Sequence, residues 1–165
     1  MQSKNFWTLL PGKLWMGGLL ANLLAIGALG QMAPMLKVEP LPTVKAAKGK
    51  TATVVVKASL PSGYHANTNK PTEAYLIPMT LKWTAGPLEL DSVEYPKGGL
   101  EKYSFSDKPL SVVTGEFAIT TKFKVPAAAA SGPAAQNGTL RYQACDNKAC
   151  YPPKNVPVSF TVNVE

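Results

Sequence analysis

Several segments after residue 50 alternate strictly between apolar and polar side chains. The pattern holds over 52–60 and over 117–125, and it is most regular near the C-terminus, where one face carries Val156, Val158, Phe160, Val162 and Val164. A period of two is typical of a β-strand with one buried side and one side in solvent. Shorter apolar runs predict further strands at 79–83, 88–95 and 140–144.

Glycine and proline separate these segments, as at Pro61-Ser62-Gly63 and Gly86-Pro87. No segment after residue 50 has a helical period, and the alanines at 127–130 lie between prolines, so we expect a loop there. Many short strands within one domain predict an all-β fold, an immunoglobulin-like antiparallel β-sandwich over 51–165. Pro157 predicts that the last strand lies at an edge or starts there.

The first 30 residues follow a different pattern. Lys4 and Lys13 precede a 17-residue apolar run at 14–30, which ends in the small residues Ala28-Leu29-Gly30. A basic start, an apolar centre and a small-residue end predict a cleaved secretory signal peptide, and an uncleaved membrane anchor is the alternative. Either reading predicts that the remaining chain is periplasmic or otherwise exported, where a disulfide can persist.

Composition narrows the function classes. Residues 31–50 are rich in Pro, Lys and Ala and predict a linker or a loosely ordered leading segment. The net charge of +7 is scattered along the chain, which predicts a solvated surface and no nucleic-acid interface. The chain has one histidine, His65, and no Ser, His and Asp in the order of a known catalytic triad. It also has no glycine-rich phosphate-binding loop and no Cys/His spacing typical of a zinc site.

The two cysteines, Cys145 and Cys150, are separated by four residues and flanked by strand-like runs. A four-residue hairpin loop brings its flanking residues opposite each other, at a Cα separation of about 4.5–5.5 Å that a disulfide tolerates. Asp146-Asn147 supplies turn-forming side chains. The spacing therefore predicts a disulfide that can open without unfolding its surroundings.

The residue chemistry of this cysteine pair is compatible with three functions. A structural disulfide is the usual role in an exported domain, but closing about six residues contributes only about 2 kcal/mol. A reversible redox pair suits a short exposed loop, and the nearby Lys148 favours a thiolate. A Cu(I) site is the third reading, but we find no convincing third ligand.

Three blocks of sequence, in order, resemble the N-terminal periplasmic domain of DsbD-type thiol:disulfide interchange proteins. They are Gly63 to Pro78 (GYHANTNKP…YLIP), Lys102 to Leu110 (KYSFSDKPL), and Tyr142 to Pro153 (YQAC…CYPP). The resemblance spans most of residues 40–165 and implies an immunoglobulin-like sandwich. It also implies protein-disulfide reductase activity, in which Cys150 attacks a partner disulfide and Cys145 resolves the mixed disulfide.

The same resemblance implies partners and supporting residues. Thioredoxin-like periplasmic proteins, of the disulfide isomerase or cytochrome c maturation type, are the expected partners. No cofactor is expected beyond the dithiol. A cap loop is expected to shield the cysteines through Tyr103 or Phe105, although ordinary packing is the alternative for both rings. Tyr142, Lys148 and Tyr151 are expected to form the thiol environment.

Two departures from the family pattern affect these expectations. The best-known members have five residues between the cysteines, whereas this chain has four. The sequence also ends at Glu165 with its last strand, so we expect a membrane electron donor to be supplied by another chain. An immunoglobulin-like binding module with a purely structural disulfide is the alternative function. For His65 we expect a local structural hydrogen bond, and for acidic turn residues such as Asp146 we expect simple solvation.

Overall fold

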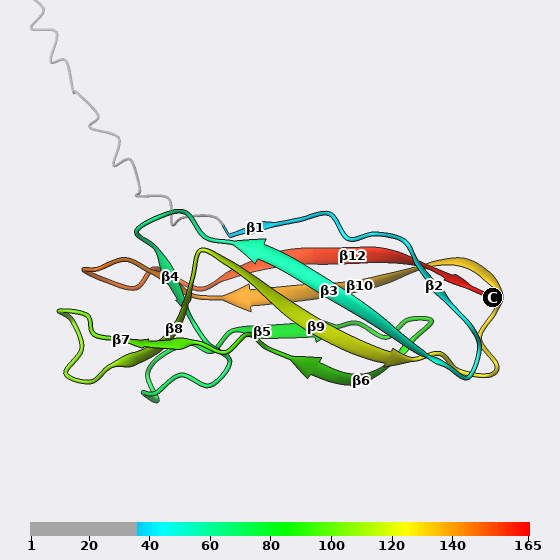
Figure 1. The fold of residues 1–165 in the computed structure, drawn as a ribbon, viewed down its shortest axis with the longest axis horizontal. Helices are drawn as coiled ribbons and strands as arrows, with labels where there is room; N and C mark the ends of the chain where they lie inside the picture. Colours follow the sequence, from blue (N-terminus) through cyan, green and yellow to red (C-terminus); the bar gives the residue numbers. More distant parts are fainter. Residues whose placement is uncertain (1–35) are drawn as a thin grey trace, which may run out of the picture. The chain divides into compact units, whose positions relative to one another are not determined.

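The computed structural model describes residues 36–165, and every regular element in this range is a β-strand (Figure 1). The strands are β1 (Lys37–Val38), β2 (Val44–Ala46), β3 (Thr51–Ser59), β4 (His65–Asn67), β5 (Thr80–Trp83), β6 (Glu89–Glu94), β7 (Gly99–Glu101), β8 (Leu110–Thr114), β9 (Glu116–Lys124), β10 (Gly132–Tyr142), β11 (Ala144–Cys145) and β12 (Lys154–Val164). They form three four-stranded sheets, in the orders β1-β3-β9-β6, β2-β12-β10-β5 and β11-β4-β8-β7. The predicted signal peptide at 1–30 lies outside the described residues.

The first two sheets pack face to face and form the predicted sandwich. In β3 every second residue is buried, because the apolar members of its alternation point inward. One core cluster joins Val54 of β3 and Phe123 of β9 to Phe160 of β12. Trp83 of β5 lies edge-on to both phenylalanine rings, with ring centroids 5.3 and 5.6 Å away. The immunoglobulin-like sandwich and the alternating strands predicted over 52–60, 117–125 and 156–164 are confirmed.

The expectation of a linker at 31–50 is wrong for the part that the structure describes. Lys37 and Val38 pair with the end of β3, and Val44 to Ala46 pair in parallel with β12. Leu36 and Ala46 are buried. Each of these strands is only two or three residues long, which is too short to show an alternation within a Pro- and Lys-rich segment.

Pro157 lies in a strand that has neighbours on both sides, but only along part of its length. It sits opposite Thr139 of β10. On the other side, β2 pairs with Val162, Asn163 and Val164. Pro157 therefore occupies a part of β12 outside the β2 pairing, where a missing amide hydrogen does not interrupt that ladder.

The third sheet lies at one end of the sandwich, at the left in Figure 1, together with the loop between β11 and β12. Its strands escaped the periodicity argument because β4 is buried at all three positions and β7 is exposed at all three. The turn before β4 closes with a hydrogen bond from Tyr64 N to Pro61 O. Gly63 supplies the positive φ, 83°, that this turn needs. Within residues 36–165 we find no helix long and apolar enough to cross a membrane.

Candidate functional site

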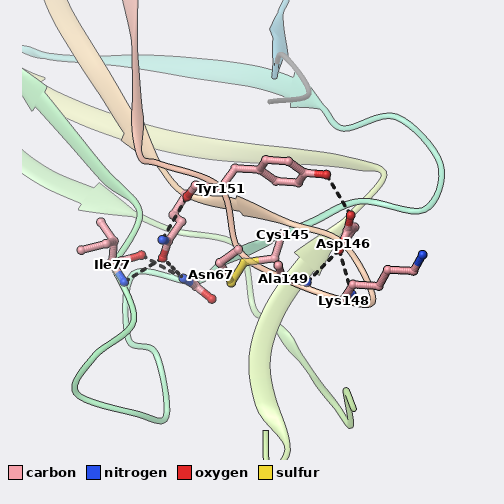
Figure 2. The surroundings of a disulfide bond; sticks show 9 residues. Asn67, Ile77, Cys145, Asp146, Lys148, Ala149 and Tyr151 are labelled. Atoms are coloured by element: carbon pink, nitrogen blue, oxygen red, sulfur yellow. Dashed lines mark hydrogen bonds between the residues drawn. A yellow bond between two sulfur atoms is a disulfide. The ribbon is translucent and has the colours of Figure 1, made fainter. Parts of the chain in front are cut away.

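Cys145 and Cys150 form a disulfide across the mouth of a four-residue hairpin loop (Figure 2). Hydrogen bonds from Asp146 N to Ala149 O (2.9 Å) and from Tyr151 N to Ala144 O (2.8 Å) flank the cysteine pair. The cysteines are therefore a non-hydrogen-bonded antiparallel pair, the kind in which opposite backbones approach most closely. Their Cα atoms are 3.9 Å apart, which is closer than the spacing argument predicts.

Asp146 organises the loop that the disulfide closes. Its Oδ1 accepts hydrogen bonds from the backbone amides of Lys148 (2.7 Å) and Ala149 (2.9 Å). Its Oδ2 accepts one from the Tyr151 hydroxyl (2.8 Å). These bonds favour the carboxylate, with the Lys148 amide contributing most, and lower the pKa of Asp146. The expectation that this acidic turn residue is merely solvated is wrong.

The partners of Asp146 bear on two predicted site residues. The hydrogen bond to Asp146 raises the pKa of Tyr151 to about 12, so its hydroxyl remains a donor. Lys148 contributes its backbone amide, whereas its side chain extends away from the disulfide in Figure 2.

The two sulfur-bearing residues differ in exposure. Cys145 is fully buried, and Cys150 is partly exposed. Cys145 lies in β11 directly opposite His65 of β4, so these two side chains project from the same face of the sheet. A reagent or partner from solvent can therefore reach Cys150 before Cys145.

A small third cluster of apolar side chains covers Cys150. It contains Leu76, Tyr103, Leu110 and Val112, and Phe105 and Cys150 pack against it. Tyr103 and Phe105 come from the segment at 102–109 between β7 and β8. The Ser104 hydroxyl in this segment donates to Asn147 O of the hairpin loop (3.0 Å). The segment is thus fastened to the loop that carries the disulfide.

Tyr103 of this cluster stacks on His65, the residue opposite Cys145. The Tyr103 ring lies 3.9 Å from the His65 ring, at an interplanar angle of 13°. The Phe105 ring is nearly parallel to both and lies beside them, with its centroid 5.6 Å from Tyr103 and 6.5 Å from His65. The Tyr103 hydroxyl donates to Glu101 Oε2 (2.6 Å), and burial together with this bond raises the pKa of Tyr103. The neutral hydroxyl therefore stays available to hold the stack.

His65 does not make the local hydrogen bond expected from the sequence. Its side chain is 2% exposed, and Nε2 has no hydrogen-bond partner within residues 36–165. Burial lowers its pKa, and the carboxylates of Glu101 and Asp146 oppose this only in part. His65 therefore serves as a neutral ring beneath Tyr103. Both rings also line a surface cleft of about 410 Å³ beside the hairpin.

The structure places Tyr142 apart from the predicted thiol environment. Its side chain belongs to the main core cluster, and its hydroxyl accepts a hydrogen bond from Leu36 N (2.9 Å). The neighbouring Gln143, which the sequence argument did not single out, instead joins the hairpin stem to Asn67 and Ile77. The sequence signal for Gln143 was its place in the YQAC block, two residues before Cys145.

Comparison with solved structures identifies the fold. The chain is similar to the N-terminal periplasmic domain of ScsB from Proteus mirabilis, with 12% identity, a TM-score of 0.54, and coverage of 78% of this chain. It spans 46% of that ScsB chain. A cohesin module from a Clostridium perfringens family 33 glycoside hydrolase is 9% identical, with a TM-score of 0.44 and coverage of 81% of this chain and 98% of the module.

Comparison of sequences identifies the family. No curated protein sequence matches this chain. The family described as thiol:disulfide interchange protein DsbD, N-terminal, matches residues 33–161. This match includes the leading strands, the covering segment at 102–109 and both cysteines. The protein therefore belongs to the family of DsbD N-terminal domains, whose name describes thiol–disulfide interchange.

Proposed function

We propose that the protein is a periplasmic thiol–disulfide exchange domain that carries electrons through a reversible Cys145–Cys150 disulfide. Its acceptors would be thioredoxin-like proteins of the disulfide isomerase or cytochrome c maturation type. A membrane electron donor would return the pair to the dithiol. The activity is that of a protein-disulfide reductase, and its redox group is the cysteine pair itself.

In the proposed step, the Cys150 thiolate attacks one sulfur of a partner disulfide. A mixed disulfide forms, and the partner's other sulfur leaves as a thiolate. The Cys145 thiolate then attacks Cys150 Sγ, which closes the intramolecular disulfide and releases the partner's second thiolate. Two electrons pass to the partner, and the protons lost by the two cysteines balance those taken up by the partner's thiolates.

The unequal exposure of the two cysteines is the observation that carries this proposal. Cys150 is partly exposed and Cys145 is fully buried, which suits an attacking and a resolving residue respectively. The segment with Tyr103 and Phe105 packs against Cys150 and is joined to the hairpin loop by the hydrogen bond from Ser104 to Asn147 O. A cover of this kind shields a reduced pair and opens for a docked partner.

The reduction potential tests the proposal. The protein is equilibrated against glutathione buffers, and its fold is followed by circular dichroism in both oxidation states. A potential between about −270 and −120 mV with the fold retained supports exchange with thioredoxin-like partners. A potential below about −300 mV, or unfolding on reduction, would instead favour a binding module with a structural disulfide.

Trapping separates the roles of the two cysteines. A Cys145→Ser variant leaves Cys150 free to form a mixed disulfide with an oxidised thioredoxin-like protein, and we expect this adduct to accumulate. The matched Cys150→Ser variant retains the buried Cys145, and we expect at least tenfold less adduct. Equal trapping by both variants would contradict the assigned roles.

A further inference from the structure

We propose that Gln143 is a positioning residue that holds the two sides of the cysteine hairpin together and thereby lowers its reduction potential. This inference rests on the proposed function, since it concerns the redox equilibrium of the same pair. Gln143 lies two residues before Cys145, and its side-chain bonds reach three separate segments of the chain.

The stem of the hairpin has a gap in its backbone ladder at this position. Tyr142 pairs with Lys154, and the bond from Tyr151 N to Ala144 O sets the next pairing. One residue, Gln143, therefore faces two, Pro152 and Pro153, which is the count of a β-bulge. Neither proline has an amide hydrogen to donate across the stem.

The Gln143 side chain bridges this gap. Its Nε2 donates to Tyr151 O (3.1 Å), the carbonyl next to Cys150 in sequence. Its Oε1 accepts from Asn67 Nδ2 (3.0 Å) and from Ile77 N (3.1 Å). Figure 2 shows the dashed hydrogen bonds of Asn67, Ile77 and Tyr151 meeting on one side of the disulfide.

The other end of the network is held by the third sheet. Asn67 is fully buried in β4, the strand that pairs with β11 at Cys145. Its Nδ2 also donates to Ile77 O (3.2 Å). Gln143 thus links Tyr151, the residue after Cys150, to β4, the strand that pairs with Cys145. Both sides of the cysteine pair are therefore attached to the same strand.

The Gln143 bonds and the disulfide stabilise each other. The equilibrium between a dithiol and glutathione measures how often one thiol meets the other, which is an effective concentration. In the oxidised protein the covalent bond already holds the two sides of the stem in place, so the Gln143 bonds form with little further loss of chain freedom. In the reduced protein the same bonds must order the stem themselves, and two prolines have removed backbone donors from it. The bonds are therefore stronger in the oxidised state, and by linkage their loss should destabilise the oxidised state relative to the reduced state.

The test compares Gln143→Met with a matched variant in β10, the strand that ends just before Gln143. Methionine keeps the length of the side chain and removes its donors and acceptor. Gln136 is a buried glutamine of β10 whose Nε2 donates to Thr84 O (2.8 Å), within the sandwich. Wild type, Gln143→Met and Gln136→Met are equilibrated with glutathione buffers, and thermal unfolding is recorded for each.

We expect Gln143→Met to lower the equilibrium constant for disulfide formation about tenfold, which raises the potential by about 30 mV. Gln136→Met should change this constant less than twofold, even if it lowers the melting temperature as much. Equal constants for wild type and Gln143→Met would overturn the proposal. If Gln143→Met does not fold, Gln143→Asn, which is too short to span the stem, carries the same expectation.

The outcome is separate from that of the proposed function. The glutathione equilibrium reports the Gln143 link whether or not any protein partner exchanges with the cysteines. If wild type fails to exchange with a thioredoxin-like protein but Gln143→Met still shifts the constant, the proposed function fails and the positioning role stands.

Discussion

The segment that covers Cys150 should open far more often when Tyr103 is replaced by alanine. The change removes the ring stack on His65 and the hydroxyl bond to Glu101. A stacked pair contributes about 1 kcal/mol, and a hydrogen bond to a partly solvated group contributes about 1 kcal/mol. Together they bias the closed state by about 2 kcal/mol, so the open fraction should rise about 30-fold.

The rate of alkylation of reduced Cys150 by iodoacetamide measures this opening. While opening and closing are fast relative to the reaction, the observed rate follows the open fraction. We expect the rate to rise about 30-fold in Tyr103→Ala. Tyr103→Phe loses only the hydroxyl bond, so its rate should rise about fivefold. Mass spectrometry of quenched samples assigns the modified cysteine.

A second tyrosine provides the control for this experiment. The Tyr95 hydroxyl accepts a hydrogen bond from Leu81 N (2.8 Å), and Tyr95 packs against the main core cluster. Tyr95→Phe removes a hydroxyl bond of the same kind from a different part of the domain, so its alkylation rate should match that of wild type. An alkylation rate for Tyr103→Ala within twofold of wild type would refute the shielding role of this segment.

Three further predictions follow from the site and the core. Replacing Asp146 with asparagine removes the anionic acceptor of the Tyr151 hydroxyl, so the pKa of Tyr151 should fall from about 12 toward its usual value near 10; ultraviolet titration, referenced to Tyr151→Phe, measures this change, and an unchanged pKa would contradict the assigned bond. His65 has a lowered pKa in the folded state, so the unfolded state binds more protons and stability should fall as pH drops below about 6.5; urea unfolding between pH 7.5 and 5.5 should show a shallower dependence in His65→Phe, and identical slopes would refute the account. Phe123→Ala empties a fully buried position between two aromatic rings and should cost roughly 3–5 kcal/mol of unfolding free energy; a loss below about 1 kcal/mol would mean that the core refills the space.

The sandwich could be predicted because burial on one face leaves a period of two in each long strand. Val54 and Val56 of β3 are buried where the alternation places them, and so are Val158 and Phe160 of β12. The strands β4 and β7 could not be predicted this way. Both faces of β4 are covered and both faces of β7 are exposed, so neither has a contrast between neighbours that a periodicity could reveal.

The hairpin could be predicted because its information is local. Cysteine spacing and turn-forming residues lie within a few positions of each other. The bond between Asn67 and Gln143 joins residues 76 positions apart, and that between Ser104 and Asn147 joins residues 43 apart. Their meeting depends on how the third sheet docks, which no short window of sequence contains. The role of Asp146 could be predicted in part. An Asp at the first position of a loop often accepts hydrogen bonds from nearby backbone amides, as Asp146 does here.

The small third cluster determines which part of the domain opens most easily. It contains only four buried residues, Leu76, Tyr103, Leu110 and Val112, whereas the two main clusters hold the long strands. Regions with few buried apolar contacts open at a lower free energy than the global transition. The amides of β7 and of 102–109 should therefore exchange with deuterium long before those of β10 and β12. The cover over Cys150 would thus be a separate cooperative unit, which can open to a partner while the sandwich and the disulfide hairpin keep their structure.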